Sequence, residues 1–486
     1  MKGSLLACSL CPEVVVLTAE SGVAEIAPPA PLGALRECMA LARNWVVLLR
    51  ETCGSSPSRP CCQRSSRSSS RRAAPDPGSR ARRTWRPGAG FRLGSAPVRP
   101  TRDVFSSQEF SRRLARAMGV TRVARVTGLD RTGVEVACAV RPGGHVLQVC
   151  NGKGLTYSDA SWGALLETAE LWAAETVVSE RLVWGSREEL DGRLGDVWSA
   201  EALGSAGALV DPRLWGDTVR CAWREALELH SGRPVWVPAQ GLHVPPQGSP
   251  SLGPVAAAWT SNGSGAHPDA GVALLHALLE ATERDQLARA LPEGWTEEGV
   301  HRRLLRPAEL QQAVPRAAEL ARALRERGFG VYLFDATPSP RVSGAVGLPV
   351  GAAVLVDLEE GPVPLTAGYA CALGRDEALL KALLEAAQSR LTDIHGARED
   401  VAATDREAAR GFAEACASVR PKRRAGDMPD LDARAKGAAV RRVRAVLERL
   451  GAAGFTRVAA VELDSPVSDL HVRRVVVPGM HISELL

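Results

Sequence analysis

No long hydrophobic run occurs anywhere in the sequence. A membrane-spanning helix needs about 20 consecutive, mostly apolar residues, whereas the best candidate, residues 35–49, is interrupted by Arg36, Glu37 and Arg43. We therefore expect no transmembrane segment and no membrane partner. Hydrophobic residues still make up 45% of the 486 residues and charged residues 24%, a composition that allows a packed core over most of the chain.

Several motifs of well-known catalytic sites are also missing. The sequence contains neither the GxxxxGK[ST] phosphate loop nor the GxGxxG dinucleotide fingerprint. The nine histidines form no HxxxH or HExxH pair, and neither Ser161 nor Ser264 lies in a GxSxG elbow. These absences argue against a P-loop site, a dinucleotide site, a zinc hydrolase and the commonest type of serine hydrolase.

The eleven cysteines form no regular framework, because six lie within the first 62 residues and five are scattered beyond them. An odd number of cysteines without a framework favours reduced thiols, so we expect a cytoplasmic protein. Cys8 and Cys11 have the spacing of half a zinc site, but no second CxxC or HxxxH follows.

Positive charge is concentrated in one stretch. The chain has a net charge of +5, but residues 51–100 alone carry eleven arginines against two acids, which leaves residues 101–486 at −4. We therefore expect no nucleic-acid partner for the globular part. Residues 1–100 are predicted to be disordered from about Ser55 to Pro100. Residues 1–100 are interpreted as a dispensable leader, or as the result of a translation start assigned too far upstream in the gene. The alternative is a basic arm that binds an acidic partner.

Residues 101–486 show a mixed pattern of helices and strands. Apolar spacing predicts a helix over residues 107–118 and Ala/Leu-rich helices near 158–180, 268–290, 307–327, 375–395, 403–418 and 433–450. Short strands are expected at 120–126, 133–140, 145–149, 330–334, 352–356 and 456–462. Because the two types alternate without a repeat period, the predicted class is mixed α/β (α+β).

One acidic pattern occurs three times on these helices. Glu167 and Glu170, Glu280 and Glu283, and Glu385 with Gln388 each lie three residues apart on a helix that is otherwise rich in Ala and Leu. Side chains at i and i+3 share a helix face, so each pair is either an exposed stripe or a buried group that needs a cation. Converging carboxylates suit Mg²⁺, which usually brings a phosphate ligand. Arginines that could bind phosphate follow two of the copies: Arg284 and Arg390.

Two glycine-rich segments precede the first two acidic helices. They are the loops expected at residues 151–154, which contain Lys153, and at residues 260–265, which contain Ser261 and Asn262. Glycine loops expose backbone N–H groups and approach anions closely.

Together these residues resemble the YcaO family of ATP-dependent enzymes that modify peptide backbones. The resemblance extends over about residues 103–480 and identifies residues 101–486 as a YcaO-like catalytic domain. The fold that it implies is a core of mixed β-sheets flanked by Ala/Leu-rich helices. The matching pieces, in chain order, are Gly152-Lys153-Gly154 with Ala160, Glu167 with Glu170, Glu280 through Glu283 and Arg284 to Asp285, Phe334-Asp335-Ala336-Thr337, Gly347-Leu348-Pro349-Val350, and Glu377 through Glu385, Gln388 and Arg390 to Asp400.

The resemblance implies ATP and Mg²⁺ as cofactors and a peptide or protein as substrate. A nucleophile attacks a backbone amide, and ATP phosphorylates the oxygen so that it leaves as phosphate, giving an azoline, a thioamide or an amidine. The metal ligands implied are Glu167, Glu170, Glu280, Glu283 and Glu385, and the ligands of ATP are Lys153, Ser261, Asn262, Arg284, Gln388 and Arg390.

Two departures from the family pattern affect this interpretation. Leu171 stands where the first ExxER motif has arginine, which supports the alternative of a degenerate scaffold that binds a peptide or a partner without turning over ATP. The C-terminal stretch Val475–His481 is similar to that of members that work with a TfuA partner, which favours a thioamide over an azoline. A homodimer is also expected.

Overall fold

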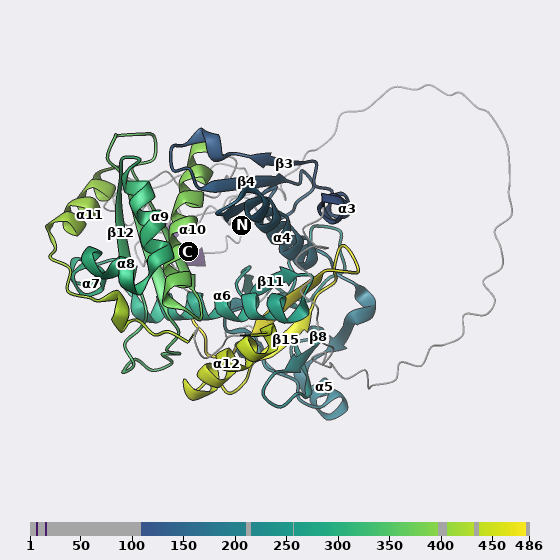
Figure 1. Ribbon diagram of the computed structural model, residues 1–486. Coiled ribbons are helices and arrows are strands. Elements are labelled where there is room, and N and C mark those ends of the chain that lie inside the picture. The colour runs from purple at the N-terminus through teal and green to yellow at the C-terminus, as the bar shows by residue number, and fades with distance from the viewer. Residues whose placement is uncertain are drawn as a thin grey trace, which may run out of the picture. The chain divides into compact units, whose positions relative to one another are not determined.

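The computed structural model describes residues 108–482 except for 210–214, 256, 397–405 and 432–436, together with Leu6–Ala7 and Val15–Val16 (Figure 1). The chain divides into two units, Met1–Arg86 and Pro87–Leu486. In the first, β1 (Leu6–Ala7) pairs antiparallel with β2 (Val15–Val16). The remaining predictions for residues 1–100 lie outside the described residues.

The described part of the second unit begins with a helix and a three-stranded antiparallel sheet, ordered β3-β4-β5. The first helix buries Phe110, Leu114 and Met118, which confirms the predicted apolar face. A long helix covers the sheet. Thr156 is its N-cap residue, and the hydroxyl of Thr156 accepts a hydrogen bond from the N–H of Asp159. These elements are α3 (Gln108–Met118), β3 (Arg122–Arg125), β4 (Glu135–Val140), β5 (Val149–Gly154) and α4 (Tyr157–Glu175).

A six-stranded sheet follows, in the order β11-β16-β15-β8-β6 with β9 paired to β8. Its two C-terminal strands lie between strands from the middle of the chain. Its strands and associated elements are β6 (Leu182–Gly185), α5 (Arg187–Leu194), β7 (Gly207–Leu209), β8 (Cys221–Glu228), β9 (Pro234–Pro238), β10 (Ala257–Trp259), β11 (Ser264–His267), α6 (Ala270–Ala290), α12 (Ala439–Ala452), β15 (Ala459–Glu462) and β16 (His471–Val476).

Strands β7 and β10 form a separate two-stranded sheet. Another sheet has the order β12-β13-β14, and all eight residues of its central strand are buried. The largest hydrophobic cluster joins this sheet to α6 and α12. The elements of this region are α7 (Glu297–Arg303), α8 (Leu310–Ala313), α9 (Pro315–Arg325), β12 (Phe329–Asp335), β13 (Val350–Asp357), β14 (Leu365–Cys371), α10 (Arg375–His395) and α11 (Arg406–Ser418).

One unit occurs three times in this fold: a strand followed closely by an Ala/Leu-rich helix. The three units are β5 with α4, β11 with α6, and β14 with α10. Each helix packs on its own strand and also on the strand of another unit, since α4 contacts β11, α6 contacts β14 and α10 contacts β5. The three units therefore form a closed cycle, and α4, α6 and α10 border the same central region in Figure 1. The predicted mixed class, with sheets flanked by helices, is confirmed.

Two predicted elements are wrong in detail. The helix expected over 307–327 is interrupted, because Pro315 lacks an N–H and starts a new helix. The strand expected at 145–149 lies instead at Val149–Gly154. The N–H groups of His145 and Val146 are bound by the Glu175 carboxylate, at 3.0 and 2.9 Å, and so are not available to a sheet.

None of the helices within the described ranges combines the length and the hydropathy that crossing a lipid bilayer requires.

Candidate active site

The first carboxylate of each acidic pair binds the strand that precedes its own helix. Glu167 accepts the N–H of Asn151 at 3.1 Å and Glu280 that of Ser264 at 3.2 Å. Glu385 accepts the N–H of Tyr369, also at 3.2 Å. In all three units, the first glutamate of the pair therefore links the helix to the strand that precedes it.

The second carboxylate reaches the strand of the next unit. Glu170 on α4 accepts the N–H of Ala266 on β11 at 2.8 Å. Glu283 on α6 accepts the N–H of Cys371 on β14 at 2.9 Å. Because these bonds link one unit to the next, the glutamates connect the three units and do not form separate exposed stripes.

Glycine in the strands makes this close approach achievable. A Cβ on Gly152 would lie 2.0 Å from the carbonyl oxygen of Ala160, and one on Gly265 would lie 2.2 Å from that of Ala273. On Gly368 it would lie 2.3 Å from the oxygen of Ala382. The first predicted phosphate loop, residues 151–154, is therefore strand β5, and its glycines serve packing against a helix rather than a loop conformation.

Burial, together with repulsion from neighbouring carboxylates, raises the pKa of three of the five glutamates. Burial and then the charges of Glu280 and Glu167 raise the pKa of Glu170 well above its ordinary 4.5. Burial also raises the pKa of Glu280. The pKa of Glu283 rises to about 7, because burial and the charge of Glu385 outweigh the nearby Arg284. A cation in this region would remove part of that cost.

Two cations lie directly beside the carboxylates. Lys153 Nζ is 2.7 Å from Glu385 Oε2. Burial alone would raise the pKa of Glu385, but Lys153 and Arg284 together lower it. The guanidinium of Arg284 lies 3.8 Å from Glu280 and 3.7 Å from Glu283, and its buried Nε has no hydrogen-bond partner among the described residues. The site thus holds two cations in direct contact with its carboxylates.

Three of the remaining predicted nucleotide ligands lie on, or next to, the elements that carry this cluster. Ser261 is exposed and Asn262 half-buried in the turn that leads into β11. Gln388 is half-buried on α10, at the position that corresponds to Glu170 and Glu283 on the other helices.

Sequence reasoning missed Arg474 on β16, which organises the second glycine segment. Its side chain is fully buried and donates to the hydroxyl of Ser264 at 2.8 Å and to the carbonyl of Gly241 at 3.1 Å. Burial lowers the pKa of Arg474 to about 10, although Glu280 and Glu170 counteract the effect. No local signal marks it, since it comes from the C-terminal strand, far from the acidic helices in sequence.

The structure does not place Arg390 at the site. The side chain is completely buried and bonds Asp130 at 2.7 Å and Asp357 at 2.5 Å, over the ring of Phe329. The predicted phosphate contact is therefore a structural ion pair instead. Helical spacing explains the difference, because a residue five positions after Glu385 points away from the face that carries Glu385 and Gln388.

Asp285, adjacent to the second acidic pair, also has a structural partner. It is fully buried and accepts from Arg289 Nε at 2.8 Å and from the N–H of His481 at 2.9 Å. Leu171, the departure in the first pair, is buried in place of a charged residue. The second acidic helix is thus tied to the C-terminal segment, whereas the first carries leucine at the position that corresponds to Arg284.

The carboxylates of this site fit a Mg²⁺ ion that is also bound by the phosphates of a nucleotide. Within the described residues, no three His, Cys, Asp or Glu side chains converge closely enough to hold a metal by themselves. Mg²⁺ is usually held by one or two carboxylates together with substrate phosphates and water. Beyond the effect of burial, the charge of Glu280 raises the pKa of Glu170, and that of Glu385 raises the pKa of Glu283, so these are the candidate pairs. Lys153 and Arg284 lie beside them for the phosphate charge.

A sequence model of the YcaO family, described as a YcaO cyclodehydratase that binds ATP and Mg²⁺, matches residues 151–481, well over half of the chain. The chain belongs to the YcaO family. The family predicted from the motifs is confirmed, and ATP and Mg²⁺ are the cofactors of that family.

Relatives of this YcaO protein include an uncharacterized protein encoded in the tfuA 3′ region of Rhizobium leguminosarum bv. trifolii. It is 28% identical over 387 residues, which are 76% of this chain and 85% of the relative.

Solved structures share the fold. YcaO from Methanopyrus kandleri, bound with AMPPCP and Mg²⁺, aligns with a TM-score of 0.56 and 24% identity over 76% of this chain and 88% of that one. A heterocyclase in complex with substrate and cofactor aligns with a TM-score of 0.57 and 18% identity, over 76% of this chain and 52% of the other.

Proposed function

We propose that this YcaO protein uses ATP and Mg²⁺ to activate a backbone amide of a ribosomally made peptide or of a protein. The observation that carries the proposal is the closed cycle of three strand–helix units. It brings five glutamates from three helices together with Lys153 and Arg284. Catalysis by positioning and by neutralising phosphate charge needs such a set of groups.

In the proposed reaction, a nucleophile adds to the amide carbon and the carbonyl oxygen becomes an alkoxide. That oxygen takes the γ-phosphoryl group of ATP and releases ADP. Loss of phosphate then re-forms a double bond to carbon. With sulfide as nucleophile the overall change is amide, hydrogen sulfide and ATP to thioamide, ADP and phosphate. With a Cys, Ser or Thr side chain of the substrate, the product is an azoline.

Each group of the site has a task in this scheme. Mg²⁺, when bound, neutralises charge on the phosphates. Glu170, Glu280 and Glu283 would hold it, and each is already oriented by a backbone N–H. Lys153 and Arg284, which lie beside these carboxylates, would contact phosphate oxygens. Arg474 would keep the turn with Ser261 and Asn262 in place for the nucleotide.

Thioamide formation is the favoured product class. It is supported by the stretch Val475–His481, which is similar to that of TfuA-associated members, and by the relative encoded in a tfuA region. A TfuA-like protein is therefore the partner that we propose, and the protein is proposed to work as a homodimer in the cytoplasm.

The proposal is tested by calorimetric titration of the full chain with ATP, with and without Mg²⁺. We expect Mg²⁺-dependent binding that a Glu280→Gln/Glu283→Gln variant weakens by about 100-fold or more. The matched control is Glu188→Gln/Asp191→Asn, an exposed acidic pair at the same i, i+3 spacing on α5. It should bind like the wild type.

The alternative is a scaffold that binds a peptide or partner without ATP turnover, and the buried Leu171 favours it. A folded wild-type protein that binds no ATP, also in the presence of a TfuA-like protein, would establish the scaffold.

A further inference from the structure

Two of the three junctions between the strand–helix units hold a cation among their carboxylates. Between the third and the first unit, Lys153 on β5 lies 2.7 Å from Glu385 on α10. Between the second and the third, Arg284 lies 3.7 Å from Glu283, which binds a strand of the third unit. We call the remaining contact, where Glu170 of the first unit binds β11 of the second, the first junction.

At the first junction, the acidic helix supplies no cation of its own. Arg284 directly follows Glu283 on α6, whereas Leu171 directly follows Glu170 on α4 and is only 4% exposed. Burial raises the pKa of Glu170, and the charge of Glu280 on α6 raises it further. A cation from another part of the chain would reduce this repulsion.

Strand pairing places Arg474 of β16 at this junction. Arg474 lies opposite Ser264 in the antiparallel register of β16 with β11, and its guanidinium donates to the Ser264 hydroxyl at 2.8 Å. The N–H of Ser264 binds Glu280. Two residues further along β11, the N–H of Ala266 binds Glu170. The arginine is therefore attached to the same strand that both carboxylates bind.

The charge of Arg474 is balanced by the carboxylates of the site rather than by a direct ion pair. Its side chain is completely buried and forms no ion pair with a carboxylate of the described residues. Burial lowers the pKa of Arg474 to about 10, and the charges of Glu280 and Glu170 act in the opposite direction. Because an uncompensated buried charge is strongly destabilising, these two glutamates are what allows the arginine to be buried here.

Hydrogen bonding alone does not account for an arginine at this position. The guanidinium donates to the carbonyls of Ala206 and Gly241, both at 3.1 Å, and to that of Thr260. Its buried Nε, however, has no hydrogen-bond partner in the described part of the chain. A neutral donor could serve the carbonyls at a lower desolvation cost. Only a cation supplies positive charge beside the two glutamates.

We propose that Arg474 is the cation of the first junction, that it takes the place of the arginine absent at Leu171, and that it holds Glu170 and Glu280 together as a pair for Mg²⁺. It is a positioning residue, since it acts on the metal through the carboxylates. The role toward Mg²⁺ rests on the proposed function, whereas the charge pairing does not. Leucine at position 171 is then no mark of a degenerate site, because β16 supplies the charge.

The charge pairing is tested without nucleotide by a double-mutant cycle at pH 8. Chemical unfolding of the full chain gives the unfolding constants of Arg474→Gln, Glu280→Gln and the double variant. The double variant should unfold about tenfold less readily than the two single changes together predict, because neither charge is left without the other.

The matched cycle combines Arg473→Gln with Glu280→Gln. Arg473 is the preceding residue of β16, is also buried and pairs with Glu462. Adjacent residues of a strand point to opposite faces of the sheet, so the effects of these two changes should add. Additive effects in both cycles would overturn the proposal, because Arg474 would then act only as a hydrogen-bonding clamp.

The role toward the metal is tested by calorimetry with ATP and Mg²⁺. Arg474→Lys keeps the charge and should weaken binding only about threefold, whereas Arg474→Gln removes it and should weaken binding about 30-fold. Adding Leu171→Arg to Arg474→Gln should recover about tenfold of that loss. If Arg474→Gln does not fold, recovery of a folded protein by Leu171→Arg is the corresponding result. Equal losses for lysine and glutamine, or no recovery by the second arginine, would overturn this role.

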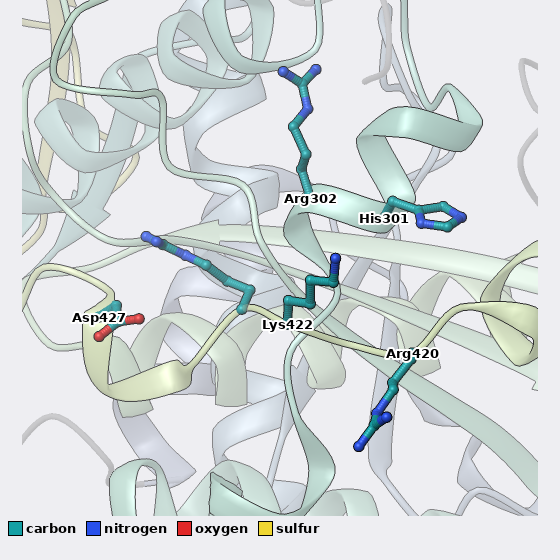
Figure 2. A pocket seen from close by; sticks show the side chains of 6 residues that line it. His301, Arg302, Arg420, Lys422 and Asp427 are labelled. Atoms are coloured by element: carbon teal, nitrogen blue, oxygen red, sulfur yellow. The ribbon is translucent and has the colours of Figure 1, made fainter.

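The control for net charge is Arg420→Gln, which should bind ATP like the wild type. Arg420 is exposed and lines a cavity of about 370 Å³ formed by residues of α7 and of the segment after α11, none of which belongs to the three units (Figure 2). An equal loss in this variant would show that only overall charge matters. A coupled cycle in a wild-type protein that binds no ATP would instead overturn the proposed function and leave the pairing of Arg474 with Glu280 in place.

Discussion

Lys153 Nζ lies 2.7 Å from Glu385 Oε2, although 232 residues separate the two in the sequence. The contact joins β5 of the first strand–helix unit to α10 of the third, and so closes the cycle that the two cross-unit glutamates begin. It also couples the predicted phosphate-binding lysine to one of the predicted metal ligands. In the proposed nucleotide complex, Lys153 would exchange Glu385 for a phosphate oxygen and would therefore keep an anionic partner.

Substitution of Lys153 by Met should therefore weaken nucleotide binding. The change removes a phosphate contact and leaves Glu385 without its 2.7 Å partner, so we expect an affinity for ATP with Mg²⁺ about 10- to 100-fold lower, consistent with the roughly 1.5–3 kcal/mol of a charged hydrogen bond. Calorimetry measures the loss. Lys422→Met, at an exposed lysine outside the site, is the control, and an unchanged affinity in Lys153→Met would show that the lysine does not contact nucleotide.

The carboxylate cluster should make both stability and binding depend on pH, in opposite directions. The pKa of Glu283 is about 7 in the folded protein, above its ordinary value, so the native state holds a proton that the unfolded chain has already lost. The contribution of Glu283 to the stability of the fold is therefore fully present below pH 4.5 and is lost as the pH rises to about 7, by about 1–3 kcal/mol.

Mg²⁺ binds the ionised form, so the affinity for ATP with Mg²⁺ should increase as the pH rises from 6 to 8. Chemical unfolding without metal and calorimetry with it, both at several pH values, measure the two trends. In Glu283→Gln both pH dependences should be reduced. Slopes identical to those of the wild type would show that Glu283 is not the titrating group.

Alanine at Gly265 should disrupt the second unit. Its Cβ would lie 2.2 Å from the carbonyl oxygen of Ala273, so β11 and α6 must separate and the bond from Ser264 to Glu280 lengthens. Overpacking of this kind costs typically 1–3 kcal/mol or more, and ATP binding should fall as well. Gly143→Ala is the control, because nothing lies within 4 Å of its Cβ position. Equal melting temperatures for the two variants would contradict the close packing.

Arg390→Met should destabilise the protein rather than change nucleotide affinity. The guanidinium is fully buried against Asp130 and Asp357, and removing one partner of a buried ion pair costs about 3–5 kcal/mol. Thermal unfolding measures this loss, and calorimetry on the folded fraction should give an ordinary affinity for ATP. A stable variant that no longer binds ATP would instead support the contact between Arg390 and phosphate that the sequence predicted.

The sequence by itself determined the local parts of this protein. The i, i+3 spacing of Glu167 with Glu170 and of Glu280 with Glu283 follows from helix geometry, as does the buried face of α3. Those motifs, in their order, were enough to predict the family and the mixed class. The glycines at 152 and 265 were predicted to form loops that approach a phosphate, whereas in the structure they lie in β5 and β11 and allow a helix to pack closely.

Only the tertiary structure decided which of these groups meet. Glu170 and Glu283 bind strands of other units, and no local pattern shows which strand N–H will face a given helix. For the same reason Arg474, which was not predicted, lies at the site, whereas Arg390, which was predicted, lies in an ion pair elsewhere. Both are buried arginines, and their roles depend on whether carboxylates of the site or of another region lie within a few ångströms, a distance set by packing between residues that are far apart in the chain.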